Sequence, residues 1–315
     1  MKKQQKNREK GWGFYIAVLI TFGLLSMIFA GILSAFSSDS AAYPSGNVAL
    51  IPVKGFIVGD AATGLISESY ASSTDIVKMI ENAEKNPSIK AIIIEIDSPG
   101  GMAVPSDEIG QAVKRANKTT VAWIRSAGAS GAYWIASAAD RIYANRMSAV
   151  GSIGVIGSYL DFSEFIQEYN VSYERLVSGE YKDMGSPFRD LEPDERQILQ
   201  DMIDKMREFF IIEVSKNRNL GYDTVEELAT GRIYLGHEAK GLGLIDNIGG
   251  KPEIKQYLRS RHNLTSVEIA EYRTQKSFFD LIGSIFSRNS FYIGKGIGDS
   301  LVEKGPASGS PLIFA

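Results

Sequence analysis

The sequence predicts a layered α/β fold, because segments typical of strands alternate with segments typical of helices from residue 47 onward. Residues 91–96 form an almost unbroken apolar run, as expected for a strand buried on both faces of a parallel sheet. Apolar residues recur at helical spacing in segment 74–86, and Pro87 follows it directly. By the same criteria we expect strands at 47–53, 120–124 and 266–272 and helices at 105–116, 131–139 and 193–217.

The helix expected at 193–217 has features of its own. Pro193 begins it, and Asp194 and Glu195 lie in its first turn, where negative charge favours the helix dipole. We interpret this helix as packing on the core or as contacting another subunit. Its apolar stripe consists of Ile198, Leu199, Met202, Ile203, Met206, Phe209, Phe210 and Val214.

Composition divides the chain into five expected parts. Residues 1–10 form a basic tail, residues 11–36 form a transmembrane anchor, and residues 37–47 form a linker. A folded domain is expected at 48–275, and an amphipathic segment with a flexible tail at 276–315.

The expected anchor, residues 11–36, carries no charge over 26 residues. As a helix it would span about 39 Å, which is enough to cross a bilayer. A cleavable signal peptide is the alternative, with a small-residue cleavage site near residues 40–42, although the apolar region exceeds the usual length of about 7–15 residues. The basic residues before the anchor and Asp39 after it place the N-terminus in the cytoplasm and the folded domain outside.

Charge and composition exclude several functional classes. The net charge is −3, and residues 11–315 contain 29 basic and 36 acidic residues, so we expect no nucleic-acid partner. The chain has no cysteine, which excludes disulfides and a thiol nucleophile. Its two histidines, His237 and His262, lie in polar, helix-like stretches without an acid-rich cluster, so we expect surface positions for them, no metal site and no cofactor.

Ser130 is the candidate nucleophile. It lies where an apolar strand turns into a helix of small residues, so its hydroxyl is held clear of its own backbone. The N–H groups at the start of the following helix are then available to a developing oxyanion. The alternative is that Ser130 is one of several small residues that let the helix approach the sheet closely.

Lys182 is the candidate general base, since neither histidine lies near a catalytic turn. A free lysine has a pKa of about 10.4, so a lysine base must be desolvated to act near neutral pH. Glu180 and Asp183 would oppose that change if they approached the ammonium, so they must point away. The alternative is an ordinary solvated loop lysine.

Two glycines are candidate oxyanion donors. The Gly100–Gly101 pair follows the apolar strand at 91–96 and lets a backbone N–H approach a ligand without an intervening side chain, so Gly101 is the first donor. Gly131, directly after Ser130, is the second. A simple type II turn explains Pro99 and Gly100 equally well.

Five motifs together resemble the signal peptide peptidase A family, in the order in which that family has them. The resemblance extends from about residue 48 to about residue 272 and implies a ClpP/crotonase-like fold of layered βα repeats behind one N-terminal transmembrane helix. The motifs are DSPGG at 97–101, ASG at 129–131, GSIGV at 151–155, YKD at 181–183 and GRIY at 231–234.

The resemblance also implies an activity. Members are membrane-anchored bacterial serine–lysine proteases, so residues 48–275 would form a peptidase domain outside the cytoplasmic membrane that degrades hydrophobic peptides, including released signal peptides. Ser130 would attack the peptide carbonyl, Lys182 would accept its proton, and Ser152 would orient the lysine. Short family members form a homo-oligomeric ring in which the serine of one subunit meets the lysine of its neighbour.

Two other classes remain open. A crotonase-type acyl-CoA enzyme would share the fold, but it would need neither an anchor nor Ser130 and Lys182. A catalytically inactive membrane scaffold would be expected to have lost the serine or the lysine, and both are present.

Overall fold

The computed structural model describes residues 5–37, 44–60 and 70–273 of the chain. These belong to two units, one made of residues 1–43 and 276–315 and the other of residues 44–275. The first unit contains α1 (Gln5–Ser37), in which Trp12–Ala30 is long and apolar enough to cross a membrane. The predicted C-terminal segment lies outside the described residues.

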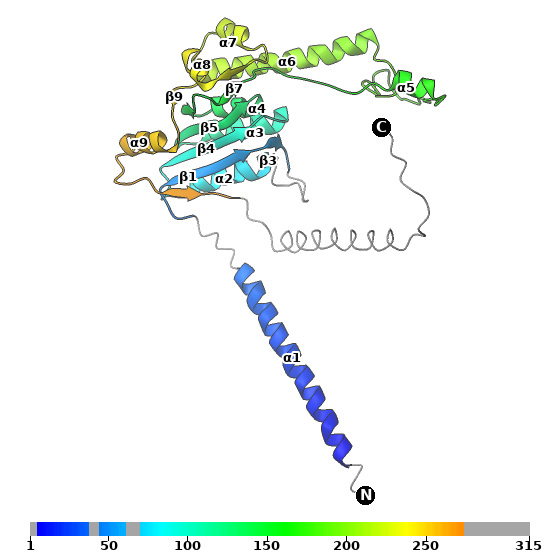
Figure 1. Ribbon diagram of the computed structural model, residues 1–315, viewed down its shortest axis with the longest axis vertical. Helices are drawn as coiled ribbons and strands as arrows, with labels where there is room; N and C mark the ends of the chain where they lie inside the picture. Colours follow the sequence, from blue (N-terminus) through cyan, green and yellow to red (C-terminus); the bar gives the residue numbers. More distant parts are fainter. Residues whose placement is uncertain (1–4, 38–43, 61–69, 274–315) are drawn as a thin grey trace, which may run out of the picture. The chain divides into compact units, whose positions relative to one another are not determined.

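The second unit is built on a sheet of eight strands (Figure 1). Its main path runs β10 (Ile269–Glu271), β1 (Val48–Lys54), β4 (Ala91–Ser98), β5 (Thr119–Ala129), β6 (Arg141–Ala144) and β9 (Asn247–Ile248), all parallel. The last residues of β5 pair instead with β7 (Ala149–Gly151), which pairs antiparallel with β8 (Ile233–Leu235). A short parallel pair, β2 (Phe56–Val58) and β3 (Tyr70–Ser72), lies beside α2 and α3.

Helices cover both faces of the sheet. One face packs against α2 (Ser73–Lys85), α3 (Ala103–Arg115) and α4 (Gly131–Ser137), and the other against α9 (Lys251–Arg261). Strand β4 is buried on both faces, as predicted: Ile92 and Ile94 belong to the larger core, and Ile93 packs with Ile254 of α9. The three helices predicted before residue 140 form within two residues of their expected bounds.

Strand β5 is longer than the predicted strand at 120–124. Beyond Ile124 its partner changes from β6 to β7. At the same point the carboxylate of Asp97 accepts the backbone N–H groups of Ser126 and Ala127 at 3.3 and 3.2 Å. This side chain replaces a strand partner where the ladder changes register, so β5 continues to the residue before Ser130.

The helix α6 (Pro193–Arg218) begins far from the sheet, with a capping box and the expected Pro193 in its first turn, and runs back toward the core (Figure 1). Its C-terminal part packs on the core, where the Phe210 ring lies 5.0 Å from that of Trp134. Its N-terminal part carries exposed apolar side chains such as Ile198 and Met202. We call residues 160–206, which include α5 (Ser163–Glu168) and this first part of α6, the arm. Two short helices follow α6, namely α7 (Tyr222–Leu228) and α8 (Gly236–Gly241).

Candidate active site

Ser130 caps the N-terminus of α4 in an unusual backbone conformation. Its φ is 52° and its ψ is −127°, a combination that residues other than glycine rarely adopt. Such a conformation costs roughly 1–3 kcal/mol and persists only where its surroundings enforce it. Here the Ser130 N–H donates to the carbonyl of Gly151 at 2.8 Å, and its carbonyl accepts from Tyr133 and Trp134 in α4. The half-buried hydroxyl donates to none of the described residues.

The glycine turn after β4 lies directly against Ser130. Gly100 has φ +108°, and a Cβ there would lie 2.8 Å from the Cβ of Ser130 and 2.9 Å from the nitrogen of Gly131. Strand β2 holds the turn from the other side, because Ile57 donates to the carbonyl of Gly100 at 2.9 Å and accepts from Met102 at 2.9 Å. Only glycine permits this approach of the turn to the serine.

Ser98, at the end of β4, stabilises the glycine turn through its side chain, a role not predicted from the sequence. Its side chain is fully buried, donates to the carbonyl of Gly55 at 2.6 Å and accepts the Gly100 N–H at 3.1 Å. A serine two residues before a glycine turn is typical of a side-chain-stabilised turn, so the DSPGG motif itself contains the signal.

The N–H groups of Gly101 and Gly131 point to no acceptor among the described residues. They lie close together, since a Cβ built on Gly131 would be 3.5 Å from the nitrogen of Gly101. Two unpaired donors beside a serine hydroxyl are suited to binding a developing oxyanion.

Ser152 lies next to the same site. Its φ is also 52°, its N–H donates to the carbonyl of Arg232 at 2.8 Å, and it follows Gly151, the residue that holds Ser130. The Ser152 hydroxyl, like that of Ser130, is half-buried and has no partner among the described residues. The structure therefore brings together four of the five predicted site residues: Ser130, Gly101, Gly131 and Ser152.

Lys182, the fifth, lies elsewhere in the same chain. It belongs to the loop that joins α5 to α6, and its ammonium is exposed without a hydrogen bond or ion pair to any described residue. Tyr181 ties this loop to the first turn of α6 through a 3.2 Å hydrogen bond to Asp194. The helix touches α4 sixteen residues later, at Phe210, so about 24 Å of helix separates the two attachments. Ser130 and Lys182 therefore do not meet within one chain.

Of the two acids beside Lys182, Asp183 is fully engaged by arginines. Arg175 and Arg189 each donate twice to its carboxylate, at distances from 2.6 to 3.1 Å. These hydrogen bonds hold the pKa of Asp183 well below its usual range. The side chain of Glu180 forms no bond with the described residues, and neither acid pairs with the lysine.

The aromatic residues of α4 serve the core. Tyr133 is fully buried and donates from its hydroxyl to the carbonyl of Leu244 at 2.8 Å, and burial raises its pKa. His237 is exposed as predicted, but His262 is not a free surface residue. It is half-buried at the end of α9, with Nε2 3.1 Å from Oγ1 of Thr119, because the strand start and the helix end meet there.

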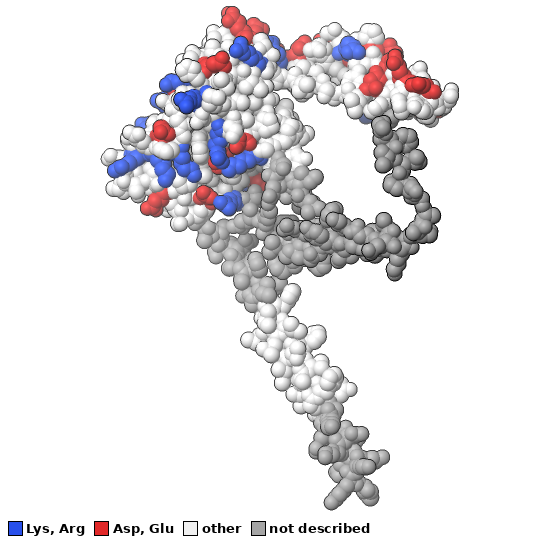
Figure 2. All heavy atoms as spheres, viewed as in Figure 1, with Lys and Arg blue, Asp and Glu red and all other residues white. Residues whose placement is uncertain are grey.

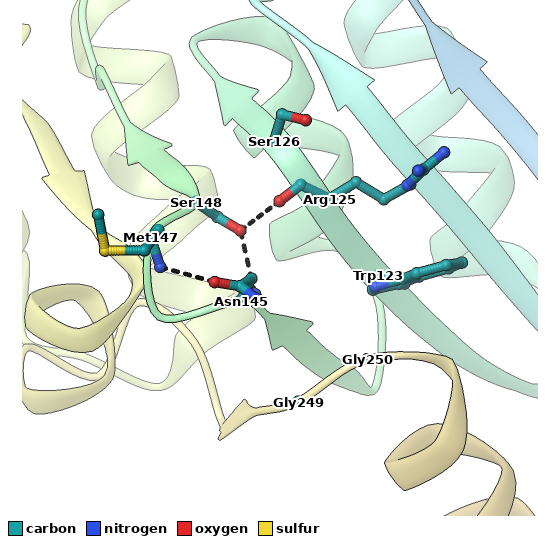
Figure 3. A pocket seen from close by; sticks show the side chains of 8 residues that line it. All are labelled: Trp123, Arg125, Ser126, Asn145, Met147, Ser148, Gly249 and Gly250. Carbon is teal, nitrogen blue, oxygen red and sulfur yellow. Dashed lines mark hydrogen bonds between the residues drawn. The ribbon is translucent and has the colours of Figure 1, made fainter.

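An open pocket of about 460 Å³ lies on the α9 face of the sheet, and it contains none of the predicted site residues. In Figure 3 the Ser148 hydroxyl donates to the carbonyl of Arg125 and accepts the Asn145 N–H, and the Asn145 side chain accepts the Met147 N–H. Basic side chains gather over the strands on the face in Figure 2, with acidic ones among them. Lys54 and Arg125 both pair with the buried carboxylate of Glu95, at 3.0 and 3.2 Å.

Within the described ranges no group of three or more His, Asp or Glu side chains could hold a metal ion.

Comparison with known proteins identifies the family. Residues 112–265 match the model of peptidase family S49. A Synechocystis protein described as a protease is 36% identical over 197 residues, which cover 62% of this chain and 70% of that protein. The chain belongs to peptidase family S49.

Other S49 relatives span more of the chain. A Methanocaldococcus jannaschii protein described as a protease is 29% identical over 299 residues, covering 92% of this chain and 94% of the relative. An Enterococcus faecium protein described as a signal peptide peptidase SppA is 29% identical over 232 residues, covering 73% and 67%. The S49 fold is ClpP/crotonase-like, in agreement with the parallel sheet and its covering helices, and the chain is a serine peptidase of the signal peptide peptidase A type.

Proposed function

We propose that this S49 peptidase is a membrane-anchored endopeptidase that uses Ser130 and Lys182 as a catalytic dyad and degrades hydrophobic peptides such as released signal peptides. The observation that carries the proposal is the position of Ser130, strained at φ 52° beside the unpaired N–H groups of Gly101 and Gly131. A hydroxyl in that position can attack a carbonyl whose oxygen lies between the two donors.

The reaction proceeds through an acyl-enzyme. The Ser130 oxygen adds to the peptide carbonyl while the neutral amine of Lys182 takes its proton, and the N–H groups of Gly101 and Gly131 bind the oxyanion. Lys182 then gives the proton to the leaving amine, which breaks the peptide bond. A water molecule activated by the same amine hydrolyses the ester and restores Ser130. The Ser152 hydroxyl orients the amine, as the carboxylate orients histidine in other serine proteases.

The lysine comes from a neighbouring subunit. The exposure of Lys182 and its position at the far end of α6 support this arrangement, because one chain cannot complete its own site. A contact that joins the arm of one subunit to the serine site of the next is heterologous, and such contacts form a ring when the rotation between neighbours closes. Exposed apolar side chains along the arm, including Phe165, Leu176 and Met202, are suited to that contact.

Membrane anchoring and the apolar substrate class have separate support. The exposed stretch Trp12–Ala30 of α1 is long and apolar enough for a single span, with the N-terminus in the cytoplasm and the peptidase domain outside. Beside the glycine turn, the side chains of Phe56, Met102 and Val104 are exposed and apolar, which favours hydrophobic peptides.

The test is hydrolysis of a fluorogenic apolar peptide by the full-length protein in detergent, from about pH 6 to about pH 10. We expect Ser130→Ala and Lys182→Ala to lower kcat at least about a hundredfold and the wild type to follow one basic ionisation. An unchanged rate in Lys182→Ala would refute the dyad. If Ser130→Ala keeps its activity and is still labelled covalently by a serine-directed phosphonate, Ser130 is not the nucleophile. If the wild type hydrolyses no peptide, the result favours an inactive scaffold.

A further inference from the structure

Two arginines enclose the short segment that carries Lys182. The Arg175 guanidinium donates to the main-chain carbonyl of Glu180 at 2.7 Å, on one side of the lysine. On the other side, the Arg189 guanidinium lies 3.4 Å from the carbonyl oxygen of Asp183. The main chain is thus held on both sides of Lys182.

The same two guanidiniums converge on one carboxylate. Arg175 binds Asp183 in a bidentate manner at 2.7 and 2.6 Å, and Arg189 binds it at 3.1 and 3.0 Å. Arg189 also donates to Glu195 at 2.8 Å, and Glu195 accepts the Glu192 N–H as part of the cap of α6. We call Arg175, Asp183, Arg189 and Glu195 the arginine clamp. It fixes the lysine loop to the beginning of α6.

The clamp is more protected than most ion pairs on a protein surface. The side chains of Asp183 and Glu195 are only 14% and 5% exposed and that of Arg189 is 19% exposed, whereas Arg175 at the outer edge is 36% exposed. Bidentate arginine–carboxylate pairs in such a network hold a defined geometry, whereas isolated exposed pairs do not.

The clamp leaves the ammonium of Lys182 without an ion-pair partner among the described residues. In an open loop, the ammonium of Lys182 would pair readily with the adjacent Asp183. Here the guanidiniums occupy both oxygens of that carboxylate, and Lys182 has no ion pair with any described residue. A base that must reach the serine of another subunit requires this freedom and a fixed backbone at the same time.

We propose that Arg175 and Arg189 are positioning residues, which keep the Asp183 carboxylate away from the Lys182 amine and hold the loop in the shape that presents this amine to a neighbouring subunit. The inference rests on the proposed serine–lysine dyad. It gives the clamp a role in the reaction beyond the stability of the arm.

The charges of the clamp predict that two substitutions move the basic ionisation of the pH–rate profile in opposite directions. In Arg175→Gln, Asp183 loses one of its two cations and becomes a partner for the lysine ammonium, so the basic ionisation in the pH–rate profile moves up. In Asp183→Asn, two guanidiniums remain without that carboxylate, so the same ionisation moves down. Besides the four clamp residues, the charged groups beside the segment are Glu180 in the loop and Asp194 on α6, which binds the Tyr181 hydroxyl.

The experiment measures kcat/KM against pH for both variants of the full-length protein. We expect the ionisation in the kcat/KM profile to move by about half a pH unit or more, upward in Arg175→Gln and downward in Asp183→Asn. Near neutral pH, Arg175→Gln should have a lower kcat with little change in KM. Arg196→Gln and Asp201→Asn are matched controls, since both residues are exposed on α6 outside the clamp, and their profiles should follow the wild type.

The outcomes separate this inference from the proposed dyad. If both clamp variants lose activity while the ionisation stays in place or moves in one direction, the clamp only stabilises the arm and the inference is wrong. If Lys182→Ala keeps its rate, both the dyad and the inference are wrong. Should Arg175→Gln fail to fold, as judged by circular dichroism and size-exclusion chromatography, the direction of the Asp183→Asn shift decides alone.

Discussion

Gly100 and Ser130 touch so closely that no side chain fits between them: a Cβ on Gly100 would lie 2.8 Å from the Cβ of Ser130. The contact joins the turn after β4 to the start of α4, and it sets the distance between the Gly101 N–H and the serine hydroxyl.

Gly100→Ala should therefore inactivate the enzyme. The new methyl group meets Ser130 and the backbone of Ala129, and φ +108° disfavours alanine independently. We expect kcat to fall at least about a hundredfold, as when an oxyanion donor is lost. Peptide hydrolysis and thermal unfolding are measured together. The control is Gly241→Ala, where the methyl group would meet open space, and near-normal hydrolysis by Gly100→Ala would contradict the proposed oxyanion site.

Subunits that carry different defects should complement each other. When Ser130→Ala and Lys182→Ala chains are co-expressed in equal amounts, about a quarter of the sites combine an intact serine with an intact lysine. The mixed protein should recover about that fraction of wild-type activity, measured as turnover of the fluorogenic peptide. If serine and lysine acted within one chain, the mixture would be as inactive as its components.

Ser98→Ala tests the support of the glycine turn. The variant loses a hydrogen bond to Gly100 in a fully buried position, so we expect kcat to fall about tenfold while KM changes little. Affinity for a peptide boronate, whose adduct places an oxygen near the same donors, should fall by a similar factor. Ser137→Ala is the control, because Ser137 is equally buried in α4 but bonds Trp134 and Asn217 away from the turn. Equal losses in the two variants would mean that Ser98 contributes only to stability.

His262 should make the fold less stable at mildly acidic pH. Burial, followed by the charges of Arg261 and Lys90, lowers the pKa of His262, so the unfolded chain binds its proton more readily than the folded chain does. Stability is then complete above the unfolded pKa of about 6.5 and declines as the pH falls below it. Thermal unfolding of His262→Gln should depend less on pH between about 7 and about 5.5 than that of the wild type. The exposed His237 provides the control in His237→Gln, and identical slopes in all three proteins would refute the linkage.

The sequence predicts most of the sheet and most of the site, because both depend on local pattern. Apolar runs and helical periodicity determine β4 and α2, and parallel strands that end at one edge bring Gly101 and Ser130 together. The end of β5 could not be predicted: residues 125–129 have low strand propensity, and pairing with β7 and the Asp97 carboxylate overrides it. The position of Lys182 depends on contacts between arginines and acids distant along an irregular loop, which no periodicity reveals.

The helix α6 contacts the core near its C-terminal end and holds the lysine loop at its N-terminal end. The core contact is made by the rings of Phe210 and Trp134, and Trp134 belongs to α4, the helix that begins immediately after Ser130. A tilt of about 10° at that point displaces the far end of α6 by about 4 Å, which is more than the length of a hydrogen bond. In the proposed assembly, a small repacking of the Phe210 and Trp134 rings would therefore change how far Lys182 reaches toward the next subunit and would couple neighbouring subunits mechanically.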